Sequence, residues 1–371
     1  MIRHGVPEVA GIGVIGCGKI CDEYLSNLNV YPGVKVLACA DIVESKARAT
    51  AKRHGVPRTV SPKHILSDPD VDIILNLTIP TAHADVTLAA IRSGKHVYSE
   101  KPLATHRTAG AAIMEASRRH GVRVGCAPDT FLGGGLQTCR RLIDSGVIGQ
   151  PIGATAFMMS HGPESWHPDP AFFYQSGGGP MFDMGPYYLS ALINLIGPIR
   201  RVSGALGSAF SERTVTSTPR SGDVIPVEVP THITALLEFS NGAIGTLITS
   251  FDVWGSDLPK IEVYGTEGSL SGPDPNKFSG PVRIHHKHDA EWRDLPLSHP
   301  EGGRGLGVTE LAASIRTQQR SRTDAELAFH VLDVMVALHE SAERGRHVNL
   351  ESTCHRPSAI PAGLVDGEFG G

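Results

Sequence analysis

The tripeptide Glu100-Lys101-Pro102 has residue types and an order that could do chemistry. It follows the run 97–99, and a strand must end here because proline fixes its own φ and lacks an N–H. In an open α/β sheet, ligands bind just beyond the carboxyl ends of the strands. A lysine at that place could act as an acid, a base or an electrostatic clamp. A surface Glu-Lys pair before a proline turn is the alternative, and a short motif alone does not decide between the two.

A second group that could do chemistry lies in the other half of the chain. The glycines 177–179 form a loop, Pro180 opens a helix and Gly197 ends it. Asp183 and Tyr187 stand four residues apart, so they share one face of that helix. The alternative for Tyr187 is that it only packs within the helix.

The elements that must position these groups begin with a nucleotide-binding pattern. Residues 9–15 are apolar, as a buried parallel strand should be, and Gly16-Cys17-Gly18-Lys19-Ile20 follows directly. Gly16 would allow a tight turn, and Gly18 would let the backbone approach a pyrophosphate closely. A helix over 19–29 would point its N-terminus at the phosphates. Cys21 holds the place of the third glycine and is small enough to let helix and strand pack closely.

An acidic residue stands where a dinucleotide would need it. The strand 34–40 ends at Asp41, which is 25 residues after Gly16 and near the spacing expected for a ribose-binding acid. A carboxylate there accepts hydrogen bonds from ribose hydroxyls and repels a 2′-phosphate, which favours NAD and leaves NADP possible. Ile42 is a further predicted cofactor contact. The alternative is that Asp41 caps the helix 44–53.

Further strands and helices alternate up to residue 126. We expect strands over 71–77, 96–99 and 122–126, with helices over 84–93 and 106–120. This alternation indicates a doubly wound parallel sheet. The turn between the first of these strands and its helix holds further predicted cofactor contacts, namely Thr78, Ile79, Pro80 and His83. We interpret His83 as a structural or cofactor contact rather than a catalyst.

The second half of the chain has a different pattern. Strand-like runs recur with a hairpin signal, Asn241-Gly242, between two of them, which indicates antiparallel pairing. These runs are 154–159, 231–239, 243–251 and 260–264, and a long helix is expected over 331–344. The histidines within 285–288 do not predict a metal site, because neighbours on a strand point to opposite faces.

Composition limits the class of function. The chain has 371 residues and a net charge of −4, so no basic face indicates a nucleic-acid partner. Its six cysteines form no CxxC pair, which predicts neither zinc nor a redox motif and fits a reduced, cytoplasmic compartment. No signal peptide or membrane-length apolar run is present. We therefore expect a small, soluble substrate and no membrane partner.

Together these motifs resemble the glucose–fructose oxidoreductase/inositol dehydrogenase/MocA family. The resemblance runs from about residue 9 to about residue 350, and it rests on the order and spacing of several short motifs. These are the segments 13–20, 80–83, 94–97, 100–102, 142–149, 177–183 and 263–270. It implies a Rossmann domain over 1–130 and a C-terminal α/β domain over 131–371, with a large open, mostly antiparallel sheet that often mediates homodimers or homotetramers.

The resemblance also implies roles for individual residues. Lys101, Asp183 and Tyr187 would be catalytic, and Glu100 and Lys101 would also contact the cofactor. Tyr187 stands where the family usually has histidine, and Ser190 stands where it often has an acid. The predicted substrate contacts are Lys101, Asp129, Trp166, His167, Asp183 and Tyr187. His167 is the other candidate for the proton acceptor.

The function that this reading predicts is an NAD-dependent dehydrogenase that oxidises a hydroxyl of a sugar, glycoside or cyclitol. A ketosugar reductase would use the same chemistry in reverse. A second alternative is a sugar-pathway regulator that binds NAD without catalysis. The intact Glu100-Lys101-Pro102 argues against this alternative. A redox-assisted glycosidase is a remote further one.

Overall fold

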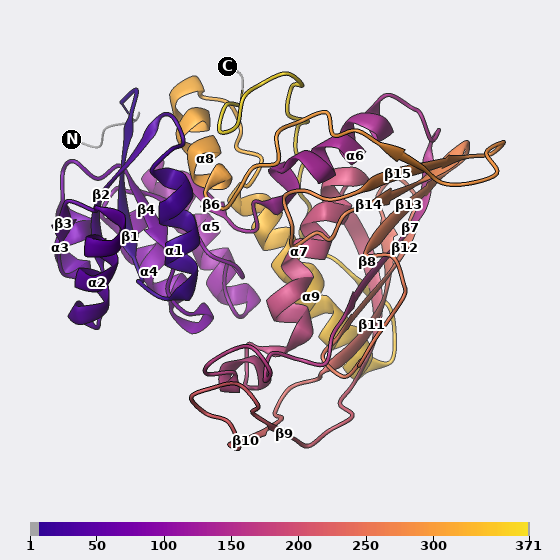
Figure 1. Cartoon of the computed structure of the whole chain (residues 1–371), viewed down its shortest axis with the longest axis horizontal. Helices are drawn as coiled ribbons and strands as arrows, with labels where there is room; N and C mark the ends of the chain where they lie inside the picture. The colour runs from indigo at the N-terminus through magenta and orange to yellow at the C-terminus, as the bar shows by residue number, and fades with distance from the viewer. Residues whose placement is uncertain (1–6, 370–371) are drawn as a thin grey trace. The chain divides into compact units, whose positions relative to one another are not determined.

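The computed structural model describes residues 7–369, and these form two compact units (Figure 1). The first unit takes the chain up to Gln137, then Ser298–Leu332 and the segment from Pro357 onward. The second unit takes Thr138–Leu297 and Asp333–Arg356. The expected division after residue 130 differs from this, because it keeps the whole C-terminal half in one domain.

Hydrogen bonds from late segments to the first unit explain the difference. The amide of Cys126 donates to the carbonyl of Thr323 at 2.9 Å, which extends the edge of the parallel sheet. The amide of Ile360 donates to Oε1 of Gln137 at 3.0 Å. These contacts between segments far apart in sequence give hydrogen-bond partners to buried backbone groups. Local sequence patterns do not predict them.

The first unit contains a six-stranded sheet with the order β3-β2-β1-β4-β5-β6, and every neighbouring pair is parallel. The strands are β1 (Ala10–Ile15), β2 (Val34–Ala40), β3 (Arg58–Thr59), β4 (Ile73–Asn76), β5 (His96–Ser99) and β6 (Val124–Cys126). The strand order reverses between β1 and β4, and in such sheets ligands bind at this switch point beyond the carboxyl ends. The predicted doubly wound parallel sheet is confirmed.

Helices join these strands where the sequence predicts them, with two additions. They are α1 (Lys19–Leu28), α2 (Glu44–His54), α3 (Pro62–Ser67), α4 (His83–Arg92) and α5 (Arg107–His120), and α8 (Leu306–Thr317) joins them from late in the chain. The short elements β3 and α3 were not expected from the sequence. The hydroxyl of Ser61 caps α3 by accepting from the amide of His64, and Pro62 starts it.

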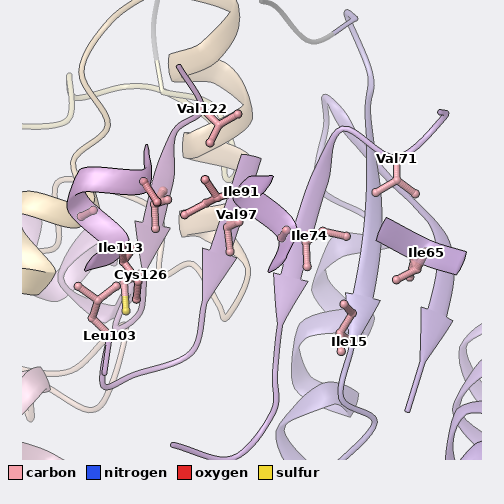
Figure 2. Close-up of a cluster of buried hydrophobic side chains, with 14 of the residues drawn as sticks. Ile15, Ile65, Val71, Ile74, Ile91, Val97, Leu103, Ile113, Val122 and Cys126 are labelled. Carbon is pink, nitrogen blue, oxygen red and sulfur yellow. The ribbon is translucent and has the colours of Figure 1, made fainter. Parts of the chain in front are cut away.

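Aliphatic side chains fix the sheet of the first unit against its helices. Figure 2 shows Ile15, Ile74 and Val97 from three strands gathered with Ile91 from α4 and Ile113 from α5. All five side chains are buried. Burial of this kind contributes about 25 cal/mol for each Å² of apolar surface removed from water. The core thus holds the strand ends that carry Asp41, Thr78 and Lys101 in fixed positions.

The second unit contains a nine-stranded sheet with the order β16-β15-β14-β13-β7-β12-β11-β8-β17. Only β7 and β12 pair in parallel; the other described pairs are antiparallel, which confirms the predicted second domain type. The strands are β7 (Pro151–Met159), β8 (Ile199–Gly207), β11 (His232–Phe239), β12 (Ile244–Ser250), β13 (Ile261–Gly265), β14 (Gly268–Gly272), β15 (Val282–His286), β16 (Arg293–Leu295) and β17 (Val348–Asn349). The hairpin at Asn241-Gly242 joins β11 to β12 as predicted.

The predicted helix after the glycine loop is α7 (Gly179–Leu195), and it packs on β7, β11 and β12. Two further helices, α6 (Gly134–Asp144) and α9 (Ala325–Arg344), each contribute residues to both units. The helix α9 begins six residues before the expected start at 331. Within residues 7–369, no helix combines the length and the apolarity that a membrane crossing requires.

Candidate cofactor-binding and active site

The loop after β1 is shaped for close contact with a phosphate group. Gly16 has φ +103°, and a Cβ there would lie 2.5 Å from the carbonyl oxygen of Leu77, so only glycine fits. At Gly18, a Cβ would meet no described atom within 4 Å, so the backbone there faces open space. Among the described residues, no side chain caps the first turn of α1, which begins at Lys19 and Ile20. The helix N-terminus is therefore arranged as an anion site.

Asp41 and the glycine loop are held together directly. Oδ2 of Asp41 accepts from the amide of Cys17 at 2.8 Å, and Oδ1 accepts from the amide of Val43 at 2.8 Å. The carboxylate thus joins the loop after β1 to the loop after β2, at the carboxyl edge of the sheet. The alternative role as a helix cap is partly present, because Val43 precedes the first residue of α2.

Two exposed isoleucines flank this edge of the sheet. The side chain of Ile42 is 95% exposed and that of Ile79 is 68% exposed. Ile42 follows β2, and Ile79 follows β4 just before the short turn that Pro80 opens. Apolar side chains this exposed are suited to cover the faces of a flat base. Together with the phosphate loop and Asp41, they fit a dinucleotide.

His83 ties the turn after β4 to the segment that carries Lys101. One ring nitrogen lies 2.7 Å from the carbonyl oxygen of Pro102, and the other lies 3.0 Å from that of Thr78. The ring is buried, and this burial lowers the pKa of His83. A neutral imidazole has one N–H, so it donates to one of these carbonyls at a time. The interpretation of His83 as a structural or cofactor contact is compatible with this geometry.

The Glu100 side chain is fixed by a residue that the sequence did not single out. The hydroxyl of Tyr24 on α1 donates to Oε1 of Glu100 at 2.8 Å, and the amide of Lys101 donates to Oε2 at 2.9 Å. Tyr24 and Glu100 are buried, whereas Lys101 is half-buried, and the bond between Lys101 and Pro102 is cis. The helix that starts at the phosphate loop is thereby hydrogen-bonded to the lysine segment.

Asp129, a predicted substrate contact, is buried within the first unit. Its side chain has no exposed surface, and Oδ2 accepts from the amides of Gly305 and Gly307 at 2.9 and 3.1 Å. Burial raises its pKa, although the nearby Arg304 guanidinium opposes the shift. These contacts anchor the 304–307 loop and the start of α8 to the first unit.

In the second unit, α7 presents the other predicted catalytic residues. Asp183 is half-buried and Tyr187 is buried, one turn apart on the same helix. Pro186 lies between them inside the helix, so the carbonyl of Phe182 lacks its usual helical donor.

Trp166 and His167 belong to an aromatic group near the start of α7. Their rings lie 5.5 Å apart edge to face, and the His167 ring packs in the same way on Phe172 and Phe173 at 5.3 and 5.2 Å. Trp166 is exposed and His167 is half-buried. The amide of Asp169 donates to Nδ1 of His167 at 3.1 Å. Across the described residues, no three His, Cys, Asp or Glu side chains are placed to hold a metal ion.

Comparisons with known proteins agree with this reading of the fold and of the cofactor site. Residues 10–127 match the oxidoreductase family with an NAD-binding Rossmann fold, and residues 136–271 match the GFO/IDH/MocA C-terminal domain. The scyllo-inositol 2-dehydrogenase (NAD(+)) of Bacillus subtilis is 27% identical over 283 residues, which cover 74% of each chain. The 1,5-anhydro-D-fructose reductase of Ensifer adhaerens is 27% identical over 266 residues, which cover 70% of this chain and 74% of that one.

A solved structure resembles the chain over nearly its whole length. It is an NAD-binding oxidoreductase from Klebsiella pneumoniae with a TM-score of 0.79 and 25% identity, covering 92% of this chain and 99% of the other. The shared domain models, the cofactor site and the full-length structural match lead to one assignment. The chain belongs to the Gfo/Idh/MocA family and is an NAD-dependent oxidoreductase.

Proposed function

We propose that this protein oxidises a hydroxyl group of a sugar, glycoside or cyclitol, with NAD as the hydride acceptor. The observation that carries the proposal is the Tyr24–Glu100–Lys101 arrangement. It fixes a lysine at the carboxyl edge of the sheet that also carries the phosphate loop and Asp41. A lysine used only for surface charge has no need of a buried glutamate beside it.

The proposal gives each candidate residue a distinct task. Bound NAD supplies the acceptor for the hydride. Lys101 stabilises the negative charge that develops on the substrate oxygen. Tyr187 accepts the hydroxyl proton, with His167 as the alternative acceptor, and Asp183 accepts a hydrogen bond from a neighbouring substrate hydroxyl. Trp166 is proposed to line the substrate site. A tyrosine is a weak base at neutral pH, so this role requires a nearby positive charge.

The first test removes the Lys101 ammonium. We expect Lys101→Ala to lower kcat by about 100-fold or more, because one such group commonly supplies a term of that size. A panel of sugars and cyclitols read by NADH absorbance would identify the substrate, and NADH fluorescence would report cofactor binding. Lys35→Ala, on the exposed side of β2, is the matched control and should keep wild-type turnover. Near-normal turnover of Lys101→Ala would return Lys101 to the surface-pair interpretation.

The second test separates an enzyme from an NAD-binding regulator. Tyr187→Phe keeps the ring and its packing and removes the hydroxyl. We expect it to fold, bind NADH and lose most turnover. Full activity would make Tyr187 a packing residue and His167 the next candidate acceptor. The regulator interpretation would replace ours if the wild type reduces NAD with no member of the panel but binds one of them tightly.

The direction of the reaction is a separate question, because one relative is named a reductase. Initial rates with the alcohol plus NAD, and with the ketone plus NADH, distinguish a dehydrogenase from a ketosugar reductase. We further propose a cytoplasmic location, which the six free, buried cysteines support. We also propose that the protein forms a homodimer or homotetramer.

A further inference from the structure

One end of the second unit carries a separate lobe. It comprises residues 160–178, 208–231 and 251–258, and we call it the aromatic lobe. It contains the two-stranded sheet of β9 (Glu212–Thr214) and β10 (Val224–Pro226) and a single helical turn over Ala171–Tyr174. Figure 1 shows β9 and β10 beyond the end of the nine-stranded sheet at which β11 begins.

A buried arginine joins the three segments of the aromatic lobe. Arg213 forms ion pairs with Glu164 at 3.0 Å and with Asp252 at 2.7 Å, so each segment contributes one member. All three side chains are almost fully buried. Oδ2 of Asp252 also accepts from the hydroxyl of Thr231 at 2.7 Å and from the amide of Ala209 at 3.1 Å. These partners hold the three segments together, because breaking such a network leaves a buried charge uncompensated.

The same arginine supports an exposed aromatic surface. Nη1 of Arg213 donates to Nε2 of His161 at 3.2 Å, and its guanidinium lies 4.6 Å from the ring centroid of Phe210. The His161 ring stacks on Trp254 with centroids 3.2 Å apart and planes 16° apart, and it meets Phe210 edge to face. Desolvation and the Arg213 charge lower the pKa of His161, so the stack rests on a neutral ring.

Trp254 is 82% exposed, although one of its faces is covered by His161. Tryptophan is the largest apolar side chain and is normally well buried, so this exposure calls for an explanation. Its neighbours in sequence, Gly255, Ser256 and Asp257, are exposed and small or polar, and Ala209 and Ser211 beside Phe210 are exposed as well. The exposed indole of Trp254 thus stands among small or polar residues, with two partly exposed apolar side chains, Phe210 and Leu258, in the same lobe.

The aromatic lobe also reaches the predicted substrate residues of the same unit. Phe251 packs edge to face on Tyr174 at 6.0 Å and on Phe173 at 6.4 Å, and Phe173 packs on Trp166 at 6.1 Å. The start of α7 lies against the lobe, because a Cβ at Gly179 would lie 3.0 Å from the carbonyl oxygen of Pro230. Asp183 follows one turn later.

We propose that Trp254, supported by His161 and Phe210, is a stacking site for a second sugar ring, so that the substrate is a disaccharide or a glycoside rather than a single ring. This inference rests on the proposed function. A pyranose has an apolar C–H face that covers an indole and hydroxyls at its rim that suit polar surroundings. A second copy of this chain would instead be expected to meet a wider apolar surface.

The first test compares substrates of different length. We expect maltose, cellobiose or lactose to exceed glucose and galactose in kcat/KM, and Trp254→Ala to remove that advantage by about 10-fold, equivalent to 1.4 kcal/mol. The rates with single-ring sugars should stay within about twofold of the wild type. Trp292→Ala is the matched control, because Trp292 is a partly exposed tryptophan of the same unit next to β16. Equal losses for one-ring and two-ring substrates, or no loss for either, would overturn the proposal.

The second test does not depend on turnover. In Trp166→Phe/Trp292→Phe the only tryptophan is Trp254, and its exposed emission should shift to the blue and saturate as disaccharide is added. Trp166→Phe/Trp254→Phe reports Trp292 and should not respond. If no sugar reduces NAD but Trp254 responds, the proposed function fails while the stacking site stands. If sugars are turned over but the Trp254 emission does not respond, the stacking site is wrong and the proposed function stands. The stacking site is also wrong if Trp254→Ala keeps its preference for disaccharides and light scattering shows that it has lost its assembly.

Discussion

At the scale of single residues, we expect Asp41 to set which cofactor the first unit prefers. Its two oxygens are held by the amides of Cys17 and Val43, so the carboxylate has a fixed place beside the phosphate loop. A 2′-phosphate near that place would be repelled. We expect the wild type to prefer NAD and Asp41→Ser to shift the ratio of kcat/KM for NAD over NADP toward NADP by about 10-fold, equivalent to 1.4 kcal/mol.

The matched control for Asp41 is Asp41→Asn, which keeps one oxygen acceptor for a backbone amide and removes the charge. If charge sets the preference, Asp41→Asn should shift the ratio as Asp41→Ser does. If the hydrogen-bonded loop geometry sets the preference, only Asp41→Ser should shift the ratio. A wild type that turns over faster with NADP at equal low concentration would show that the assignment of Asp41 is wrong.

Tyr24 is the residue whose loss tests how Lys101 is positioned. Tyr24→Phe leaves the buried Glu100 carboxylate with the Lys101 amide as its remaining described partner, and an unsatisfied buried acceptor costs about 1–3 kcal/mol. We expect kcat to fall by about 10-fold or more with little change in NADH affinity, and the pH profile of kcat to move. Tyr31→Phe is the control, because it also removes a mostly buried tyrosine hydroxyl, which donates to the carbonyl of Gly303 at 3.4 Å. Equal behaviour of the two variants would reduce Tyr24 to a packing residue.

At the scale of elements, the sequence predicted what local chemistry determines. The strands 10–15 and 34–40, with the turn at Gly16, followed from apolar runs and glycine spacing. The elements β3 and α3 were missed because two and six residues carry too little periodicity. The anchoring of the 304–307 loop by Asp129, and the buried charge of Arg213, join residues far apart in sequence. No spacing rule predicts such pairs, which form only when the chain folds.

The pairing of β5 with β6 should make folding sensitive to acid. Nδ1 of His96 accepts from the amide of Arg123 at 2.9 Å, and burial, followed by the Arg123 charge, lowers the pKa of His96 to about 4. The unfolded chain takes up a proton near pH 6.5 and the folded one does not, so stability is full above pH 6.5 and falls as the pH drops toward 4. The loss from this group is about 2–3 kcal/mol by pH 4.5, at 1.36 kcal/mol for each pKa unit.

His96→Gln keeps a hydrogen-bond acceptor that does not titrate. We expect its free energy of unfolding in urea to fall less than that of the wild type, by about 2 kcal/mol, between pH 7 and pH 4.5. His83, another buried histidine with a lowered pKa, is present in both proteins, so its contribution cancels in the comparison. If the free energies of unfolding of the two proteins depend on pH in the same way, His96 has the same pKa in the folded and the unfolded state.

At the scale of the whole molecule, the nine-stranded sheet has one face packed and one face open. The helix α7 covers one face of β7, β11 and β12. Leu236, Thr246 and Thr155 are paired across the other face and are half-buried or exposed. Ile244 on the same face is also exposed. An antiparallel sheet can leave one face to water, but two exposed aliphatic side chains on adjacent strands, Leu236 of β11 and Ile244 of β12, suit a partner surface.

We therefore expect a second copy of the chain to cover this face, with roughly 800 Å² buried on each partner, as stable interfaces require. Leu236→Glu/Ile244→Glu should convert the wild-type dimer or tetramer into smaller species at micromolar concentration, read by light scattering, because two carboxylates would be buried without partners. Val224→Glu is the control: Val224 is equally exposed but lies on β10, outside the large sheet. Near-ultraviolet circular dichroism should show that all three proteins keep the same fold. A wild type that is monomeric at micromolar concentration would rule out the interface. If Val224→Glu alone causes disassembly, the interface lies on the aromatic lobe instead.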